Sequence, residues 1–450
     1  MNTIKEFFSN KEIYSGKEVK VSGWIRNNRS QSQFGFIDLS DGSSFNTVQV
    51  VYENTLTNFE DIQKYRNGAC VEVKGEFVLT PDRGQPFEIH ASEVNLLGDS
   101  TPDFPVQPKR HTREFLREIP HLRVRTKLFQ AVFRVRNEAA FAIHKFFQEK
   151  GFIYVHTPIF TSNDGEGAGQ LFSVSTDSKN PYTDFFGKNV YLTVTGQLHV
   201  EPFAMAFRNV YTFGPAFRAE NSNTQKHASE FWMVEPEMAF CDLKGEMDTA
   251  EALVKYVIKD VLENAKDEME FFDKFVEKGL IERLKAVLNT KEFARVTHKD
   301  AITLLRESKV NFENEPKYGE DIAREHEKWL TEHFNGPVFV YDWPKDIKAF
   351  YMKVNADGET VAASDLLVPE SGELVGGSQR EENLDVLVKR MDELKMNKEI
   401  LDWYLDTRRY GGCVHSGFGL GFERLIMFLT GVDNIRDVEA YPRTPNNCEF

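Results

Sequence analysis

Between residues 18 and 97 the chain alternates apolar and polar residues in five short runs that are separated by turn residues. The runs read EVKVSGWIR, FGFIDLSDG, TVQVVYE, ACVEVKGEFVL and FEIHASEV. Alternation with a period of two predicts strands that bury one face. Five short strands in ~100 residues fit a small Greek-key barrel, so we expect such a barrel over residues 1–100.

Barrels of this size commonly belong to the oligonucleotide-binding type. They bind single-stranded nucleic acid with aromatic side chains that stack on bases and with cations that contact phosphates. Residues of both kinds gather in the first two predicted strands: Trp24, Arg26, Arg29, Phe34 and Phe36. Alternating aromatic residues can equally fill the core of a small barrel, and the pattern alone leaves both interpretations open.

The composition changes after residue 100, where prolines interrupt the alternation. Between residues 100 and 136 nine Lys or Arg residues face three acidic ones, although the whole chain has a formal charge of -15. That acidic balance excludes a uniformly basic nucleic-acid coat, but this segment could follow a phosphate backbone. It could also be a solvated helix start that pairs with acidic surface elsewhere. We predict a basic linker over residues 101–125.

Residues 126–450 predict a larger domain of mixed elements. Apolar residues recur at helical spacing from Thr126 to Lys150, and Gly151 supplies a stop signal. Further helices are expected around residues 249–288, 320–334 and 384–410. A buried strand is expected at FIYVHTPIF, and others at NVYLTVT, NVYTFG, EFWMVEPEMAF, GPVFVYDW and FYMKV. Strands that follow one another without regular helices between them favour an α+β fold with a mainly antiparallel sheet flanked by helices.

Several common chemistries are excluded by what the sequence lacks. It has no GxxxxGK[ST] phosphate loop, and SGFGLGFER fails the dinucleotide fingerprint because Phe422 stands where the third glycine is required. The four cysteines form no CxxC pair, which argues against a zinc site or a disulfide framework. A run of ~18 apolar residues and a signal peptide are both absent, so we expect a cytoplasmic protein without a membrane partner.

The segment GPAFRAENSNTQKHASEFWMVEPEMAF carries residues suited to nucleotide chemistry. If it forms a strand, a loop and a return strand, Arg218 and Glu220 share one face by their spacing. Phe231, Glu235 and Glu237 then share one face of the return strand. Such a face offers a cation for phosphate, a ring for stacking, and carboxylates for an ammonium group or a metal. Charges on a solvated hairpin are the alternative.

The segment SGFGLGFER places three alternate glycines before Glu423, Arg424 and the apolar helix LIMFL. This pattern predicts a strand with one bare face, followed by a helix that carries a cation. A flat ligand such as a purine could lie on the bare face with the guanidinium stacked on it. A glycine-rich strand that needs the room for helix packing is the alternative.

These two segments resemble the second and third signature motifs of the class II aminoacyl-tRNA synthetases. The stretch from Lys150 to Phe160 resembles the first motif, whose proline, here Pro158, lies at the dimer interface in that class, so the resemblance implies a homodimer. The HIGH and KMSK signatures of class I enzymes are absent. The resemblance covers essentially the whole chain and points to the aspartyl, asparaginyl and lysyl subgroup. It is closest to the asparaginyl members, through NDGEGAGQLF, LTVTGQLHVE, RAENSNTQKHASEFWMVEPE, GELVGGSQRE and PRTPNNCEF.

The resemblance implies that ATP activates L-asparagine and that the product is transferred to tRNA(Asn). Arg218 is expected to bind the α-phosphate, and Arg424 to lie over the adenine near the γ-phosphate. Glu220 is expected to accept a hydrogen bond from the adenine amino group while Phe231 stacks under the ring. His227, where aspartyl enzymes usually carry Arg, is expected to contact the γ-phosphate.

The resemblance also implies a divalent cation. Asp365 and Glu373 match the carboxylates that hold Mg²⁺ in the family, and hard oxygen ligands suit a cation that bridges phosphates. Glu373 therefore joins Arg218 and Arg424 in the expected catalytic set.

The amino-acid pocket has to separate asparagine from aspartate by charge, because the two are almost equal in volume. Aspartyl enzymes of the family place Lys directly after the residue that matches His199, whereas this chain has Val200 and then Glu201. A carboxylate at Glu201 would accept from the asparagine amide and repel aspartate, by ~4 kcal/mol at ~4 Å and an effective dielectric near ~20. Arg380 is expected to hold the side-chain oxygen. Three further residues are expected around the α-ammonium group: Glu166, Gln197 and Glu235.

In the barrel, the resemblance aligns Phe36 and Gln49 with positions that stack on and hydrogen-bond the anticodon. Arg26 and Arg29 are expected to contact phosphates or bases, and Glu88 is a weaker candidate for the same site. These residues would read a GUU anticodon from splayed bases, as single-stranded RNA usually is read.

Two other functions stay open. An aspartyl enzyme of relaxed specificity is disfavoured by Val200 and Glu201. A catalytically inactive paralogue that binds RNA is disfavoured by the joint presence of the charged residues expected to bind ATP: Arg218, Glu220, Glu373 and Arg424.

Overall fold

The computed structural model describes residues 2–163, 165, 170–176 and 185–450. Two compact units divide the chain between Ala131 and Val132, inside helix α6 (Lys127–Glu149). We call residues 1–131 the barrel unit and residues 132–450 the sheet unit. The segment predicted as a linker, 101–125, groups with the barrel, and the division falls a few residues after the predicted domain start at 126.

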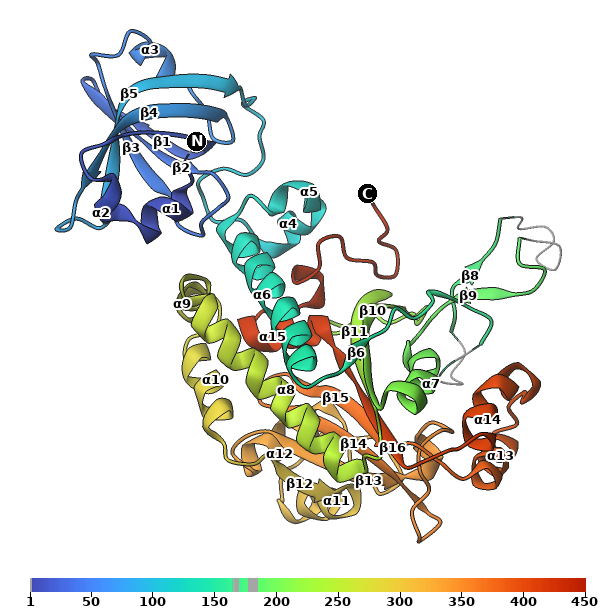
Figure 1. Ribbon diagram of the computed structural model, residues 1–450. Helices are drawn as coiled ribbons and strands as arrows, with labels where there is room; N and C mark the ends of the chain where they lie inside the picture. The colour runs from blue at the N-terminus through green and yellow to red at the C-terminus, as the bar shows by residue number, and fades with distance from the viewer. Residues whose placement is uncertain (1, 164, 166–169, 177–184) are drawn as a thin grey trace. The chain divides into compact units, whose positions relative to one another are not determined.

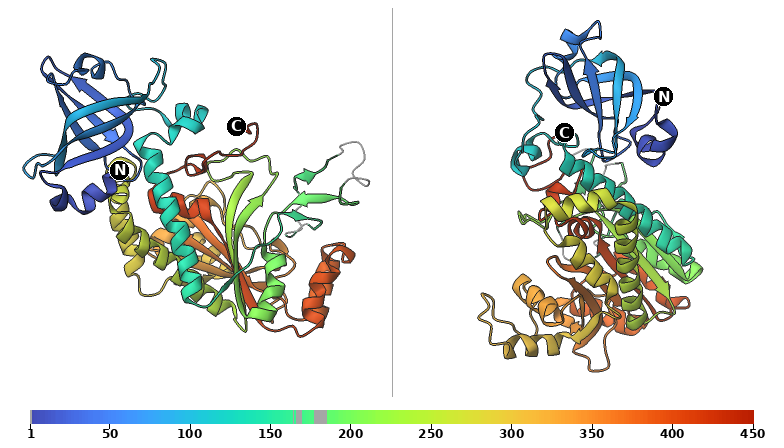
Figure 2. Two further views of the ribbon diagram at one scale, coloured as in Figure 1. Left: turned by 45° about the horizontal axis from the view of Figure 1, so that its top comes forward. Right: turned by 90° about the vertical axis from the view of Figure 1, so that its left-hand side faces the viewer.

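The barrel unit contains the five predicted strands, which close in the order β1-β2-β3-β5-β4 (Figures 1 and 2). Their bounds are β1 (Glu18–Ser30), β2 (Phe34–Ser40), β3 (Val48–Glu53), β4 (Cys70–Leu79) and β5 (Phe87–Gly98). Alternate residues such as Val21, Ile37 and Val50 are fully buried inside. The predicted five-stranded barrel is therefore confirmed. Short helices α1 (Ile4–Ser9), α2 (Lys11–Tyr14) and α3 (Phe59–Ile62) complete it.

The segment predicted as a linker contains two short helices, α4 (Arg113–Glu118) and α5 (Pro120–Arg123). Thr112 caps α4 by accepting a hydrogen bond from the backbone N–H of Phe115 at 3.2 Å. Pro120 stands at the first position of α5, where its missing N–H costs nothing.

The sheet unit is built on an eight-stranded sheet in the order β12-β13-β14-β15-β16-β11-β10-β6. Pairs inside the sheet are antiparallel, and only the end pairs β6–β10 and β12–β13 are parallel. The predicted mainly antiparallel sheet is confirmed. Its strands are β6 (Ile153–Tyr154), β10 (Asn209–Phe217), β11 (Glu230–Ala239), β12 (Ala294–Thr297), β13 (Val338–Pro344), β14 (Thr360–Val368), β15 (Gly372–Gln379) and β16 (His415–Gly421). A small separate sheet pairs β7 (Phe160–Thr161), β9 (Val190–Leu192) and β8 (Ser173–Val174).

Helix α8 (Leu243–Asn264) packs against β14, β15 and β16, so it covers one face of the large sheet (Figure 1). Helices α7 (Gln197–Phe207) and α15 (Phe422–Thr430) pack against β11, and α6 matches the helix predicted over residues 126–150. The remaining helices are α9 (Lys266–Phe275), α10 (Leu280–Asn289), α11 (His298–Glu307), α12 (Arg324–His333), α13 (Leu384–Glu393) and α14 (Asp402–Arg409).

Two strand predictions are wrong. Residues 152–160 do not form one buried strand: β6 and β7 belong to different sheets, and Ile153 is 45% and Phe160 51% exposed. Pro158 interrupts the pairing between them, because a proline cannot donate to a strand ladder. FYMKV forms only isolated bridges, at Met352 and Val354. Its aromatic residues are buried in the core because they pack against α13 and α14, which explains why the segment resembled a strand.

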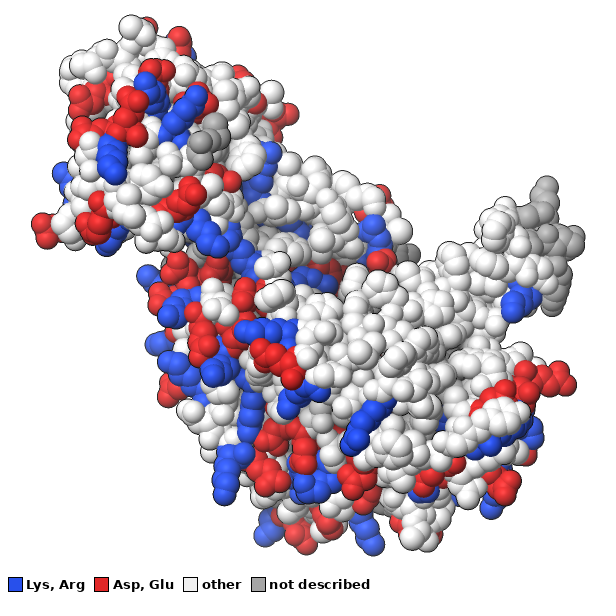
Figure 3. All heavy atoms as spheres, in the orientation of Figure 1, with Lys and Arg blue, Asp and Glu red and all other residues white. Residues whose placement is uncertain are grey.

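The sheet unit also exposes apolar side chains on α6, β6, β7 and α7, and Figure 3 shows few charges over the part that carries β10 and α7. The larger ones are Phe141, Ile153, Phe160, Phe203 and Phe207. All four cysteines are free, as predicted. Within the described part of the chain, every helix is too short or too polar to cross a membrane.

Candidate active site

A cavity of about 620 Å³ opens on the sheet unit. It lies on the face of the sheet opposite α8: Ser364 of β14 donates to Glu246 of α8 at 2.7 Å, while the next residue, Asp365, lines the cavity. Its size falls within the usual range for small-molecule sites, ~300–1,000 Å³. Ten of the residues predicted for ATP, cation or amino acid line it: Gln197, Arg218, Glu220, His227, Phe231, Glu235, Asp365, Glu373, Arg380 and Arg424.

Glycines form part of the cavity wall, as the alternate glycines of SGFGLGFER predicted. Gly419 and Gly421 of β16 and Gly376 of β15 line it. A Cβ at Gly419 would lie 2.6 Å from the methyl carbon of Met233, so a side chain there would displace the neighbouring strand's residue. The first glycine of the motif, Gly417, instead makes room for Glu237, whose carboxylate oxygen would lie 2.3 Å from a Cβ at that position.

Cations gather at one end of the cavity. Arg218 lies with its guanidinium carbon 5.4 Å from the centre of the Phe231 ring. Strand β10 ends at Phe217, so Arg218 and Glu220 follow the strand and do not share a strand face, contrary to the prediction. Burial and the nearby Arg424 lower the pKa of His227, which favours its neutral form at pH 7.

Arg424 of α15 joins this end of the cavity to Glu373 of β15. Its Nη1 donates to Glu373 Oε2 at 3.1 Å and to the Glu373 carbonyl at 3.2 Å. Burial alone would raise the pKa of Glu373, but Arg424 and Lys348 hold it below its usual value. Glu373 is therefore an ionised carboxylate that fixes the guanidinium beside the cavity.

Asp365 and Glu373 also converge on one point. A Cβ at Gly376 would lie 3.3 Å from Glu373 Oε1 and 3.5 Å from Asp365 Oδ1, so the glycine leaves room between the two carboxylates. Their hard oxygens suit Mg²⁺. No group of three acidic, His or Cys side chains able to hold a metal occurs among the described residues, so a cation here would complete its shell with phosphate or water oxygens. Asp365 and Glu373 therefore fit a Mg²⁺ ion that takes its other ligands from phosphate or water.

The other end of the cavity is suited to an amino acid. Gln197, the first residue of α7, is buried, and its Nε2 has no hydrogen-bond partner, so it is a donor in need of an acceptor. Glu235 accepts from the backbone N–H of Gly196 at 2.8 Å and from the Thr195 hydroxyl. These bonds fix a carboxylate on the cavity wall, where an ammonium group could meet it.

Arg380 closes this end. Its Nε donates to Glu237 Oε2 at 3.3 Å, its Nη2 to Glu237 Oε1, and its Nη1 to Ser378 Oγ at 2.7 Å. Burial raises the pKa of Glu237 and Arg380 opposes that shift. Both carboxylate oxygens accept guanidinium N–H groups, which is the arrangement of an ionised pair. The charge of Arg380 is thus largely offset by Glu237.

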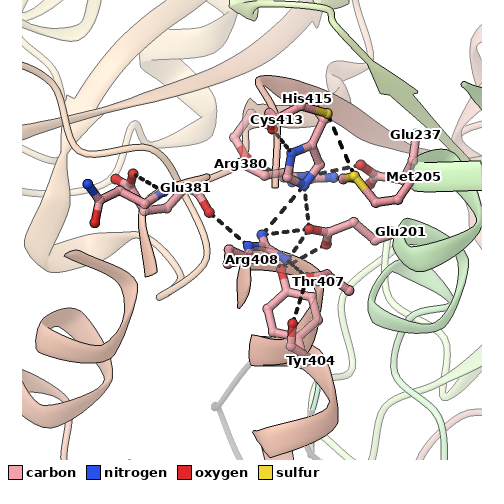
Figure 4. A network of polar contacts seen from close by, with 12 residues as sticks. Glu201, Met205, Glu237, Arg380, Glu381, Tyr404, Thr407, Arg408, Cys413 and His415 are labelled. Atoms are coloured by element: carbon pink, nitrogen blue, oxygen red, sulfur yellow. Dashed lines mark hydrogen bonds and ion pairs between the residues drawn. The ribbon is translucent and has the colours of Figure 1, made fainter. Parts of the chain in front are cut away.

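Glu201 lies outside this wall, although we expected it to contact the substrate amide. It is fully buried, and both its oxygens are taken by Arg408, Tyr404 and His415 (Figure 4). Arg408 lies 2.6 Å and His415 2.6 Å from Oε1, and they lower the pKa of Glu201 although burial alone would raise it. Its partners lie more than two hundred residues away in the sequence, so local spacing could not predict their contact. We call Glu201, Tyr404, Arg408 and His415 the closed cluster. Glu166 lies outside the described residues.

On the barrel, four of the five candidate anticodon residues form a connected cluster. Arg29 donates to Gln49 at 3.1 Å and lies 5.4 Å from the centre of the Phe36 ring, and Gln49 donates to Glu88 at 2.8 Å. We call these four residues the barrel cluster. Arg26 is separate: it donates to the carbonyl of Arg125, and burial lowers its pKa to about 10.

Two further cations, to which the sequence assigned no role, line the cavity: Lys226 inside the motif segment and Lys348 outside every motif. Lys226 precedes His227 in the loop between β10 and β11 and donates to the carbonyl of Ser371; burial, with Arg324 nearby, lowers its pKa to about 8. Lys348 follows β13 and pairs with Asp365. Lys226 could have been suspected from its neighbours, whereas nothing in WPKDIKAFYM marks Lys348.

Comparison with known proteins places both units in families. The family of tRNA synthetases class II (D, K and N) matches residues 112–445, and the OB-fold nucleic acid binding domain matches residues 19–97. The asparagine–tRNA ligase of Acholeplasma laidlawii is 61% identical over 461 residues, covering 100% of this chain and 99% of that protein. That of Clostridium novyi is 56% identical, with 99% of each covered.

Solved structures of asparaginyl-tRNA synthetases also resemble this chain. The crystal structure of asparaginyl-tRNA synthetase from Pyrococcus horikoshii complexed with asparaginyl-adenylate matches with a TM-score of 0.88 at 33% identity over 97% of each chain. The complex of Entamoeba histolytica asparaginyl-tRNA synthetase with asparaginyl-adenylate matches with a TM-score of 0.85 at 28% identity, again over 97% of each chain.

Proposed function

The chain belongs to the class II tRNA synthetases of the aspartate, lysine and asparagine group, and from that premise we propose that it joins L-asparagine to tRNA(Asn) with ATP. Asparagine and ATP would give asparaginyl-adenylate and pyrophosphate, and transfer to the 3′ end of the tRNA would release AMP. This proposal is carried by one observation: a cavity whose wall combines the cations Arg218 and Arg424, the glycines of β15 and β16, and Arg380, whose charge Glu237 offsets.

In the first step the α-carboxylate of asparagine attacks the α-phosphate of ATP, and the bond to pyrophosphate breaks. Negative charge grows on the phosphate oxygens, so fixed cations lower the barrier. Arg218 and Arg424 supply them, and the 3.1 Å contact with Glu373 holds Arg424 in place before the substrates arrive. The attacking carboxylate is already ionised, so this step needs positioning and charge more than proton transfer.

The adenine would lie against the glycine wall at Gly419 and Gly421, between Phe231 and Arg424. Glu220 would accept from the adenine amino group, and His227 would contact the γ-phosphate. Asp365 and Glu373 would hold Mg²⁺, which when bound neutralises phosphate charge. Support for that placement comes from the two carboxylates that converge beside Gly376.

Selection of asparagine would depend on the charge at Arg380. Because Glu237 already offsets the guanidinium, a carboxylate side chain gains less attraction there than at a free arginine, while an amide oxygen can still accept a hydrogen bond. Glu235 would supply a carboxylate and Gln197 its amide oxygen to the α-ammonium group, and the Gln197 Nε2 is a buried donor besides. Glu166 is proposed for the same ammonium.

We retain Glu201 in the proposal in a changed role. Its negative charge acts on Arg380 across the buried cluster and not by contact with the substrate. Arg408 at 2.6 Å offsets most of this charge, so Glu201 would add only a small bias against aspartate, and Tyr404 and His415 hold it in position.

In the second step the 3′-hydroxyl of the terminal adenosine attacks the acyl carbon of the adenylate. The barrel cluster would read the anticodon, since Phe36 offers a ring for stacking while Arg29 and Gln49 offer donors. Arg26, held by the Arg125 carbonyl, is proposed only as a phosphate contact.

A homodimer is part of the proposal. It is supported by large apolar side chains that the sheet unit leaves exposed, since a subunit interface covers side chains of this kind: Phe141, Ile153, Phe160, Phe203 and Phe207. A cytoplasmic location stays a prediction.

The direct test is aminoacylation of tRNA(Asn) with radiolabelled asparagine by wild-type protein and by Arg218→Ala. Wild type is expected to charge the tRNA, and the variant to lose at least about a hundredfold of kcat/KM, because one fixed cation is worth ~3 kcal/mol in such a transition state. Wild-type activity in the folded variant would contradict the role of Arg218, and an inactive folded wild type would contradict the function.

A further inference from the structure

Lys348 is held from two sides at the edge of the cavity. Its Nζ lies 2.7 Å from Asp365 Oδ2 and 3.8 Å from the centre of the Trp343 ring. Trp343 is buried, and its indole N–H donates to the carbonyl of Val340 at 2.9 Å, so the ring is fixed. The side chains of Lys348 and Asp365 are only 16% and 12% exposed, so water screens their attraction weakly.

Both carboxylates proposed to hold Mg²⁺ therefore already pair with a cation of the protein. Asp365 is paired with Lys348, and Glu373 with Arg424 at 3.1 Å. The oxygens that face Gly376 are Asp365 Oδ1 and Glu373 Oε1, but Lys348 on Oδ2 and Arg424 on Oε2 already offset the charge of both carboxylates. A divalent cation that arrives alone therefore meets two nearby positive charges that repel it. ATP changes this balance because its phosphates bring negative charge that offsets the repulsion from Lys348.

We propose that Lys348 is a positioning residue that acts as the resident counter-ion of the divalent-cation site, holding Asp365 in place and suppressing cation binding until ATP is present. The inference rests on the proposed function, which supplies the cation and the nucleotide. In this role Lys348 makes binding of the cation depend on binding of the nucleotide.

The test measures binding of Mn²⁺ alone to the purified full-length protein by the electron paramagnetic resonance signal of free Mn²⁺. Wild type is expected to bind Mn²⁺ weakly without nucleotide and more tightly with a non-hydrolysable ATP analogue. Lys348→Met is expected to bind Mn²⁺ at least tenfold more tightly than wild type without nucleotide, because Asp365 is then free.

Three variants separate this role from a general structural effect. Lys348→Arg keeps the charge and is expected to match wild type, and Lys348→Met combined with Asp365→Asn is expected to lose the gain. Lys328→Met removes an exposed lysine of α12 and is expected to change nothing. Lys348→Gln also removes the charge, and it is measured in parallel in case Lys348→Met does not fold.

Mn²⁺ affinity of the folded Met or Gln variant within twofold of wild type would overturn the proposal, as would an equal gain in Lys328→Met. The Mn²⁺ measurement without nucleotide requires no turnover. Failure of wild type to charge tRNA would therefore count against the proposed function alone.

Discussion

Glu237 holds Arg380 by two hydrogen bonds, and both side chains are almost completely buried, with 0% and 3% exposed. Arg380 lines the end of the cavity where we place the side chain of the substrate. A buried arginine that faces its own carboxylate offers hydrogen bonds without offering a full positive charge, which is what an uncharged amide requires.

Replacing Glu237 by Gln should weaken the discrimination against aspartate. The guanidinium would then carry an uncompensated charge, and the aspartate side chain would gain attraction that asparagine does not. We expect the ratio of kcat/KM for asparagine over aspartate to fall at least tenfold, equivalent to about 1.4 kcal/mol. The measurement is ATP–pyrophosphate exchange with each amino acid. Glu251→Gln, which breaks a Lys255 pair outside the cavity, is the matched control, and an unchanged ratio in folded Glu237→Gln would refute this reading of the pocket.

Glu201→Gln should destabilise the protein strongly. Arg408 and Glu201 are both 0% exposed and 2.6 Å apart, so the substitution would leave a buried guanidinium without its partner. Breaking such a pair costs about 3–5 kcal/mol. We expect urea denaturation of the sheet unit to show a loss of that order. The double variant Glu201→Gln with Arg408→Met should recover part of it, because no charge is then stranded. A single variant as stable as wild type would rule out the closed cluster.

Glu246 should make stability depend on pH. Burial raises the pKa of this carboxyl, on α8 behind the cavity, from 4.5 to about 8. The folded protein therefore keeps a proton that the unfolded chain releases, so the contribution to stability is full below pH 4.5, falls as the pH rises, and is lost above pH 8. Glu246→Gln removes this loss. We expect the variant to gain at least about 1 kcal/mol over wild type at pH 7.5 and nothing at pH 4.5 in chemical denaturation. A difference that is the same at both pH values would contradict the assignment.

Phe36→Ala should weaken tRNA binding and leave the chemistry intact. A base stacked on an aromatic ring contributes ~1–3 kcal/mol, so the dissociation constant for tRNA(Asn) should rise by about 5- to 150-fold. Binding is measured by filter retention, and adenylate formation by pyrophosphate exchange without tRNA. Leu97→Ala, another exposed apolar residue of the barrel, serves as the control. Equal tRNA affinity for Phe36→Ala and wild type would remove Phe36 from the anticodon site.

The sequence predicted the cavity well where its residues lie in local motifs. Arg218, Phe231 and Glu235 belong to one hairpin, and Gly419 and Arg424 to one strand–helix unit, so short-range spacing was enough to bring each set together. The barrel was predictable for the same reason, because alternation within single strands reports one buried face.

Long-range pairing could not be predicted. Arg408 meets Glu201 only because α14 packs against α7, and Lys348 meets Asp365 only because β13 pairs with β14. Helix starts and polar turns that contain such residues look like ordinary solvated surface in the sequence. The segment 350–354 misled because apolar residues that pack into a core without joining a sheet have the composition of a strand. The segment 152–160 misled because its apolar run is divided between two sheets and leaves Ile153 and Phe160 exposed.

The central claim, that this cavity activates asparagine, is tested most directly by ATP–pyrophosphate exchange with purified wild-type protein, Mg²⁺ and each of the twenty amino acids in turn. The account predicts exchange with asparagine alone. Exchange with aspartate at a comparable rate would contradict the charge argument at Arg380, and no exchange with any amino acid, in protein shown to be folded, would contradict the proposed reaction itself.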